Sequence, residues 1–126
     1  MTEKNIVVID DEESMGRLLK IELASEGYNV TLAYDGKVGF QLIKDTKPDL
    51  VVLDVMMPEV SGYDVLRRLK QNAETKSIPV IILTAKGLEP DIQKGLDLGA
   101  NDYITKPFHS ALLIKRIRNC LELTEL

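Results

Sequence analysis

Three carboxylates, one hydroxyl and one ammonium stand where short apolar runs of this chain end: Asp10, Asp11, Asp54, Thr84 and Lys106. The run before Asp54 is unbroken and made of valine and leucine, which predicts a strand buried on both faces. An ionised carboxylate is costly to desolvate, so Asp54 is expected at the carboxyl end of its strand, where ligands bind. We interpret Asp54 as a nucleophile that the other polar strand ends serve.

The chemistry that these groups favour is phosphoryl transfer. Clustered carboxylates repel one another unless a cation is present, and Mg²⁺ is held in proteins by one or two carboxylates together with phosphate oxygens. Carboxylate, Mg²⁺ and lysine form a phosphoryl-transfer set, and aspartate is a known acceptor. Thr84 is then expected to hydrogen-bond a phosphoryl oxygen, and Lys106 to pair with its charge.

The run of four acids that starts at Asp10 also has a simpler interpretation. Acids near a helix N-terminus are stabilised by the helix dipole, by roughly 0.3–1 kcal/mol. This accounts for Glu12 and Glu13, with Ser14 as the expected N-cap of the helix that follows. It explains less well why two aspartates follow directly on a buried strand, so we favour a metal-binding role for Asp10 and Asp11.

Five extended segments are expected to position these groups: residues 6–9, 28–33, 50–53, 80–83 and 102–105. A helix is expected after each, the last from about Ser110. This alternation predicts an α/β fold, a flavodoxin-like doubly wound five-stranded parallel sheet with five helices. The common strand order is 2-1-3-4-5, with the segment 28–33 at an edge. Parallel strands end at the same edge, so the five groups are expected to meet there.

Composition limits the other functions that the chain can have. A chain of 126 residues with 44% hydrophobic and 29% charged residues fits one globular domain, residues 1–126. The net charge of −4 argues against direct nucleic-acid binding, and we expect Arg67, Arg68 and Lys70 to form a solvated helix face. The chain has one cysteine, Cys120, which fits a reducing compartment. It has no apolar run long enough to cross a membrane and no secretory signal, so we expect a cytoplasmic protein that is not inserted in a membrane.

Taken together, the sequence resembles the receiver domains of two-component response regulators, the CheY-like superfamily. The marks of the resemblance are Asp10-Asp11, Asp54, Met57-Pro58 with Gly62, Thr84-Ala85, Tyr103 and Lys106-Pro107-Phe108. The resemblance covers the whole chain, with the response regulatory domain at about residues 4–122. It implies a phosphoacceptor that acts on itself and is not a turnover enzyme.

The resemblance also implies roles for individual residues. Asp54 would accept a phosphoryl group from a sensor histidine kinase or a phosphotransfer protein. Mg²⁺, or Mn²⁺ in its place, would be held by Asp11, Asp54 and the backbone carbonyl of Met56, with Asp10 acting through water.

Further implied roles concern the loops and the switch. Pro58 and Gly62 would be structural, and the bond to Pro107 would be cis. On phosphorylation, Thr84 would move toward the phosphoryl group and Tyr103 would turn inward. The face formed by the fourth helix, the fifth strand and the fifth helix would then change shape.

The output is open between two alternatives: a stand-alone receiver that docks to a partner, or the regulatory part of a DNA-binding transcription factor. The sequence around Thr84 and Lys106 looks like the winged-helix class, whose receivers dimerise on phosphorylation through the face just described. Asp102 and Arg116 match charged positions of that face. Leu112 replaces a usual acid and Asn101 a frequent aspartate, so the full ion-pair network of the class is not expected.

Two rival functions fit the pattern less well. A haloacid-dehalogenase-like phosphatase would carry a second aspartate two residues after the first, on the first strand, whereas Asp54 lies on the third strand and is followed at that spacing by Met56. A flavodoxin-like flavin binder would need a phosphate loop rich in Ser, Thr and Gly after the first strand. The acids that begin at Asp10 would repel a phosphate there.

Overall fold

The computed structural model describes residues 3–57, 60–85 and 89–125 of the chain. Strands and helices alternate along it as expected. The strands are β1 (Asn5–Ile9), β2 (Asn29–Ala33), β3 (Leu50–Asp54), β4 (Val80–Thr84) and β5 (Asp102–Thr105). The helices are α1 (Glu13–Ser25), α2 (Gly36–Thr46), α3 (Gly62–Gln71), α4 (Glu89–Asp97) and α5 (Ser110–Glu125).

All four strand pairings are parallel, and the order is β2-β1-β3-β4-β5, which confirms the predicted topology. The register brings the carboxyl ends together. Ile9 pairs with Leu53, Asp54 with Leu83, and Thr84 with Thr105. The residues that leave β1, β3, β4 and β5 therefore start from one edge of the sheet.

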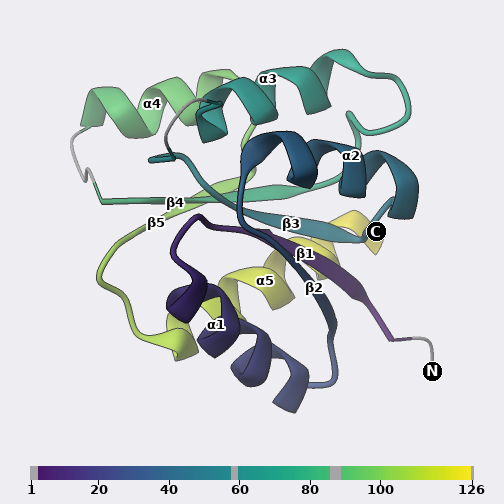
Figure 1. Cartoon of the computed structure of the whole chain (residues 1–126), viewed down its shortest axis with the longest axis vertical. Helices are drawn as coiled ribbons and strands as arrows, with labels where there is room; N and C mark the ends of the chain where they lie inside the picture. Colours follow the sequence, from purple (N-terminus) through teal and green to yellow (C-terminus); the bar gives the residue numbers. More distant parts are fainter. Residues whose placement is uncertain (1–2, 58–59, 86–88, 126) are drawn as a thin grey trace.

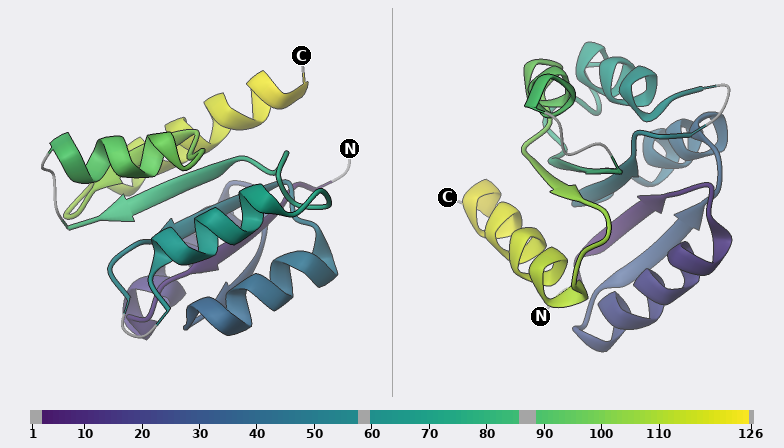
Figure 2. Two further views of the ribbon diagram at one scale, coloured as in Figure 1. Left: turned by 90° about the horizontal axis from the view of Figure 1, so that it is seen from above. Right: turned by 90° about the vertical axis from the view of Figure 1, so that its left-hand side faces the viewer.

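Helices cover both faces of the sheet (Figures 1 and 2). One face packs on α1 and α5 through a buried cluster that includes Leu19, Val52 and Ile117. The opposite face packs mainly on α2 and α3 through a second cluster that includes Ile43 and Leu66. Strands β3 and β4 are buried along their whole length, because both of their faces are covered.

The first turn of α1 differs from the expectation. The N-cap is Glu12, which makes no side-chain capping hydrogen bond, and Ser14 lies inside the helix. The Asp10 carboxylate accepts a hydrogen bond from the Glu12 backbone N–H at 3.0 Å. Because this bond fixes the turn directly after β1, the helix begins before Ser14 is reached.

Lys70 also departs from the expectation of a solvated face. Arg67 and Arg68 are exposed, but Lys70 is partly buried. Its ammonium donates to the backbone carbonyls of Lys76 and Ile78, at 3.1 and 2.9 Å, and so ties α3 to the segment before β4. Burial lowers the pKa of Lys70 below its ordinary value of 10.5.

No helix in the described part of the chain is long and apolar enough to cross a membrane.

Candidate functional site

Three of the predicted residues form an acidic group at the carboxyl edge of the sheet. One carboxylate oxygen each from Asp10, Asp11 and Asp54 lies within 4.8 Å of the others. Asp10 and Asp54 are 1% and 3% exposed, whereas Asp11 is exposed to solvent. Asp10 and Asp54 are therefore buried at the edge of the sheet, and Asp11 is accessible to a ligand that binds there.

The two buried aspartates are fixed in the same way. Each accepts a hydrogen bond from the backbone N–H two residues further along, Glu12 for Asp10 at 3.0 Å and Met56 for Asp54 at 2.9 Å. Aspartate often bonds to its own backbone at this spacing. No role was predicted for these two N–H groups, although an aspartate directly at the end of a strand is a sequence signal for such a bond.

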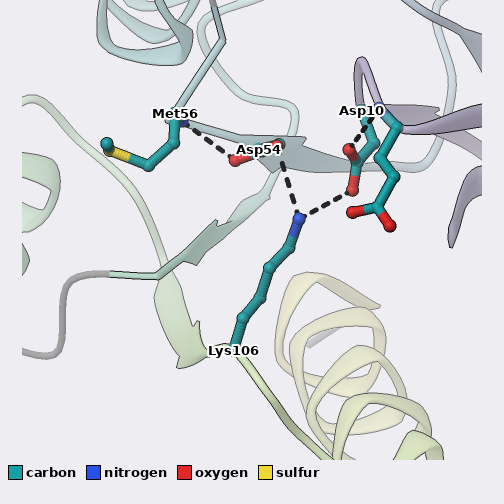
Figure 3. A network of polar contacts seen from close by, with 5 residues as sticks. Asp10, Asp54, Met56 and Lys106 are labelled. Atoms are coloured by element: carbon teal, nitrogen blue, oxygen red, sulfur yellow. Dashed lines mark hydrogen bonds and ion pairs between the residues drawn. The ribbon is translucent and has the colours of Figure 1, made fainter.

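Lys106 completes the group from the far end of the chain. Its ammonium lies 3.0 Å from Asp10 Oδ2 and 3.4 Å from Asp54 Oδ2, and it points between the two carboxylates (Figure 3). The backbone N–H of Lys106 donates to the Thr84 carbonyl at 2.7 Å, which anchors the residue after β5 to the end of β4. The Lys106–Pro107 peptide bond is cis.

The charges in the site perturb one another. Burial raises the pKa of Asp54, against the lowering effects of the Met56 N–H and of Lys106, and the nearby Asp10 raises it further. Burial alone would lower the pKa of Lys106, but hydrogen bonding and attraction to Asp10 and Asp54 outweigh it, so the pKa is raised. Lys106 is therefore a fixed cation at neutral pH. Asp54 takes up a proton more readily than an exposed aspartate does.

The remaining predicted residues lie around this group. Thr84 is buried at the end of β4. Tyr103 is partly buried on β5 and packs against the cluster shared with α2 and α3. Gly62 begins α3, and a Cβ placed on it would overlap the Asp54 carbonyl oxygen. Pro58 lies outside the described residues.

The donor set suits a hard divalent cation. Mg²⁺ prefers oxygen ligands and keeps several of its waters, so it needs few protein groups. Two buried carboxylates and one exposed carboxylate meet here, and Lys106 pairs with the two buried ones. The residues therefore fit Mg²⁺, and the two positive charges of the ion would also relieve the repulsion that helps to raise the pKa of Asp54.

The fold and this edge of the sheet define a receiver domain. The family described as the response regulator receiver domain matches residues 6–118, and the chain belongs to that family. Members of the family bind Mg²⁺ at an acidic pocket and are in general not turnover enzymes.

Individual relatives agree with this assignment. The chain is 46% identical over 121 residues to an uncharacterised transcriptional regulatory protein, YkoG, of Bacillus subtilis (strain 168). That match covers 96% of the chain and 52% of YkoG, so the chain spans about half the length of this curated relative.

Among solved structures, the receiver domain of the Francisella response regulator 1452 matches with a TM-score of 0.91 and 33% identity, over 97% of this chain and 99% of the other. The receiver domain of a signal transduction histidine kinase from Syntrophus aciditrophicus matches with a TM-score of 0.87 and 33% identity, over 94% and 90% of the two chains.

Proposed function

We propose that this chain is a phosphorylation switch in which Asp54 accepts a phosphoryl group from a phosphohistidine on a sensor kinase or phosphotransfer protein. An oxygen of Asp54 attacks the phosphorus, the P–N bond breaks, and its electron pair returns to the histidine nitrogen. The observation that carries the proposal is the position of Asp54, which is held by the Met56 N–H and lies beside Asp10, Asp11 and Lys106.

We propose further that Mg²⁺ is held by Asp11, Asp54 and the Met56 carbonyl, with Asp10 acting through water. When bound, the ion supplies neutralisation of phosphoryl charge. Lys106 is already placed between two carboxylates, so it can pair with an arriving phosphoryl oxygen after a short movement of its ammonium. Mn²⁺ offers the same preference for oxygen and is the expected substitute.

The proposed output is a change of the surface formed by α4, β5 and α5. Thr84 ends β4 and Tyr103 lies on β5, so a shift of Thr84 toward a phosphoryl group acts directly on the neighbouring strand. We place a phosphorylation-dependent homodimer at this surface. Asp102 and Arg116 belong to it and pair within one molecule through hydrogen bonds of 2.7 and 2.8 Å.

The decisive experiment is mass spectrometry after incubation with acetyl phosphate, with and without Mg²⁺. We expect one phosphoryl adduct on the wild-type chain that requires the metal and is absent from Asp54→Asn. The matched control is Asp45→Asn, which makes the same substitution at an exposed aspartate of α2 and should leave the adduct intact. No adduct under any condition would overturn the proposal. Gel filtration of the adduct tests dimerisation separately.

A further inference from the structure

A second polar feature lies away from the phosphorylation site, in a cavity of about 250 Å³ between α1 and the beginning of α5. These two segments lie side by side on one face of the sheet (Figure 1). The cavity is lined by Met15, Leu18, Leu19, Glu22, Phe108, His109 and Ser110. The lining combines four apolar side chains, among them Leu18, which is 50% exposed, with the polar residues Glu22, His109 and Ser110.

Glu22 is the unusual member of this lining. Its Oε2 is buried and has no hydrogen-bond partner among the described residues. Buried carboxylate oxygens in proteins are normally hydrogen-bonded or paired with a cation, because an unsatisfied one loses its hydration without compensation. The Oε2 atom of Glu22 therefore needs a partner that residues 3–57, 60–85 and 89–125 do not provide.

The dipole of α1 also favours a cation near Glu22. Glu22 lies in the last turn of α1, where the backbone carbonyls carry partial negative charge, and that turn contains no basic residue. Arg118 of the neighbouring helix α5 is paired with Glu26 at 3.5 Å. A carboxylate and a helix C-terminus thus present negative charge together, in a cavity that is also lined by apolar side chains.

We propose that this cavity binds an alkyl cation, a guanidinium or primary ammonium group on a short aliphatic chain. The head would pair with Glu22, and the aliphatic chain would lie against Met15, Leu18 and Phe108. The head faces Glu22 and not Ser110, because the N-terminus of α5 carries partial positive charge. A free amine and the side chain of an arginine or lysine on another protein share this chemistry.

The test is a titration of the full chain with n-butylguanidinium, followed by amide chemical shifts in NMR. We expect saturable shifts confined to residues around the cavity in α1 and in the segment that begins α5. The neutral isostere n-butylurea and the variant Glu22→Gln should each weaken binding at least fivefold. Glu13→Gln, which removes an exposed acid from the same helix, should leave the affinity unchanged.

A second NMR titration distinguishes a free amine from a protein side chain as the source of the cation. It uses the peptides Ac-Ala-Arg-Ala-NH₂ and Ac-Ala-citrulline-Ala-NH₂. Shifts of the same amides by the arginine peptide assign the cavity to a protein side chain, and shifts by n-butylguanidinium alone assign it to a free amine. Equal binding of n-butylurea, equal binding to Glu22→Gln, or shifts that do not saturate would overturn the proposal. These titrations do not involve Asp54, so their outcome is independent of whether the proposed phosphorylation is confirmed.

Discussion

The ammonium of Lys106 lies closer to Asp10 than to Asp54, at 3.0 against 3.4 Å, although 96 residues separate Lys106 from Asp10 in the chain. The Asp10 side chain is fully buried and that of Lys106 is 17% exposed. Asp10 is therefore the main anchor of the lysine in this structure. A phosphoryl group on Asp54 would compete with Asp10 for the same cation.

Replacement of Lys106 by methionine should destabilise the fold at neutral pH. The change leaves the carboxylates of Asp10 and Asp54 buried without their ammonium, and breaking a buried ion pair typically costs about 3 kcal/mol. Urea unfolding should report this loss, and added Mg²⁺ should recover part of it if the acids hold the ion. Lys115→Met removes an exposed cation from α5 and is the control. Equal losses in the two variants would contradict the prediction.

The variant Gly62→Ala should disturb β3, the strand that carries the proposed phosphoacceptor Asp54. A Cβ at this position would overlap the Asp54 carbonyl oxygen and the Val55 Cα, which are backbone atoms that cannot rotate away. We expect a loss of about 2–3 kcal/mol in the free energy of unfolding, together with slower formation of the phosphoryl adduct.

Gly27→Ala separates these two effects. Gly27 has a φ of 91° and an added Cβ would meet nothing within 4 Å, so alanine there costs about 1 kcal/mol through the backbone alone. The adduct should form at the wild-type rate in this variant. A Gly62→Ala chain that is phosphorylated at the wild-type rate would show that the close approach to Asp54 does not matter for the chemistry.

The stability contribution of Lys70 should increase with pH. Its pKa in the folded state is lowered from 10.5 by burial, so between the folded value and 10.5 the unfolded chain binds more protons and stability rises with pH. At neutral pH, Lys70→Met should cost about 1–2 kcal/mol, because two backbone carbonyls lose their donor. Urea unfolding of both chains should show a larger difference at pH 10 than at pH 7. A difference in the free energy of unfolding that stays constant or decreases between pH 7 and pH 10 would contradict the prediction.

Glu22→Met should stabilise the free chain by about 1 kcal/mol. Methionine has a similar length, packs well against Met15, Leu18 and Phe108, and removes the carboxylate oxygen for which the described part of the chain offers no partner. Thermal unfolding compared with Glu13→Met, an exposed position on the same helix, provides the measurement. A destabilised Glu22→Met chain would mean that the carboxylate stabilises the fold, which is the opposite of our interpretation.

Much of the fold was predictable because buried parallel strands carry a strong pattern. The apolar runs before Asp10, Asp54 and Thr84 end within one residue of the ends of β1, β3 and β4, and right-handed crossovers left few possible orders. The grouping of Asp10, Asp11 and Asp54 followed from this topology alone. No knowledge of side-chain conformations was needed for it.

Other features depend on contacts that sequence periodicity does not encode. The start of α1 is set by the Asp10 side chain and not by Ser14. Lys70 lies on a helix with exposed Arg67 and Arg68, yet it reaches two carbonyls of a later loop. The cavity beside Glu22 likewise exists only because α1 and the beginning of α5 lie side by side, and the position of Glu22 in a helical segment does not predict it.

The position of β5 at the end of the strand order has a consequence for synthesis on the ribosome. When only β1 to β4 of a nascent chain have emerged from the ribosome, these strands can already pair, because β1, β3 and β4 are neighbours in the sheet. The nascent chain then carries Asp10 and Asp54 side by side while Lys106 is still inside the ribosomal exit tunnel. The carboxylates must remain hydrated or protonated during that interval, so emergence of the last strand, and not pairing of the first four, is the step that closes this edge of the sheet.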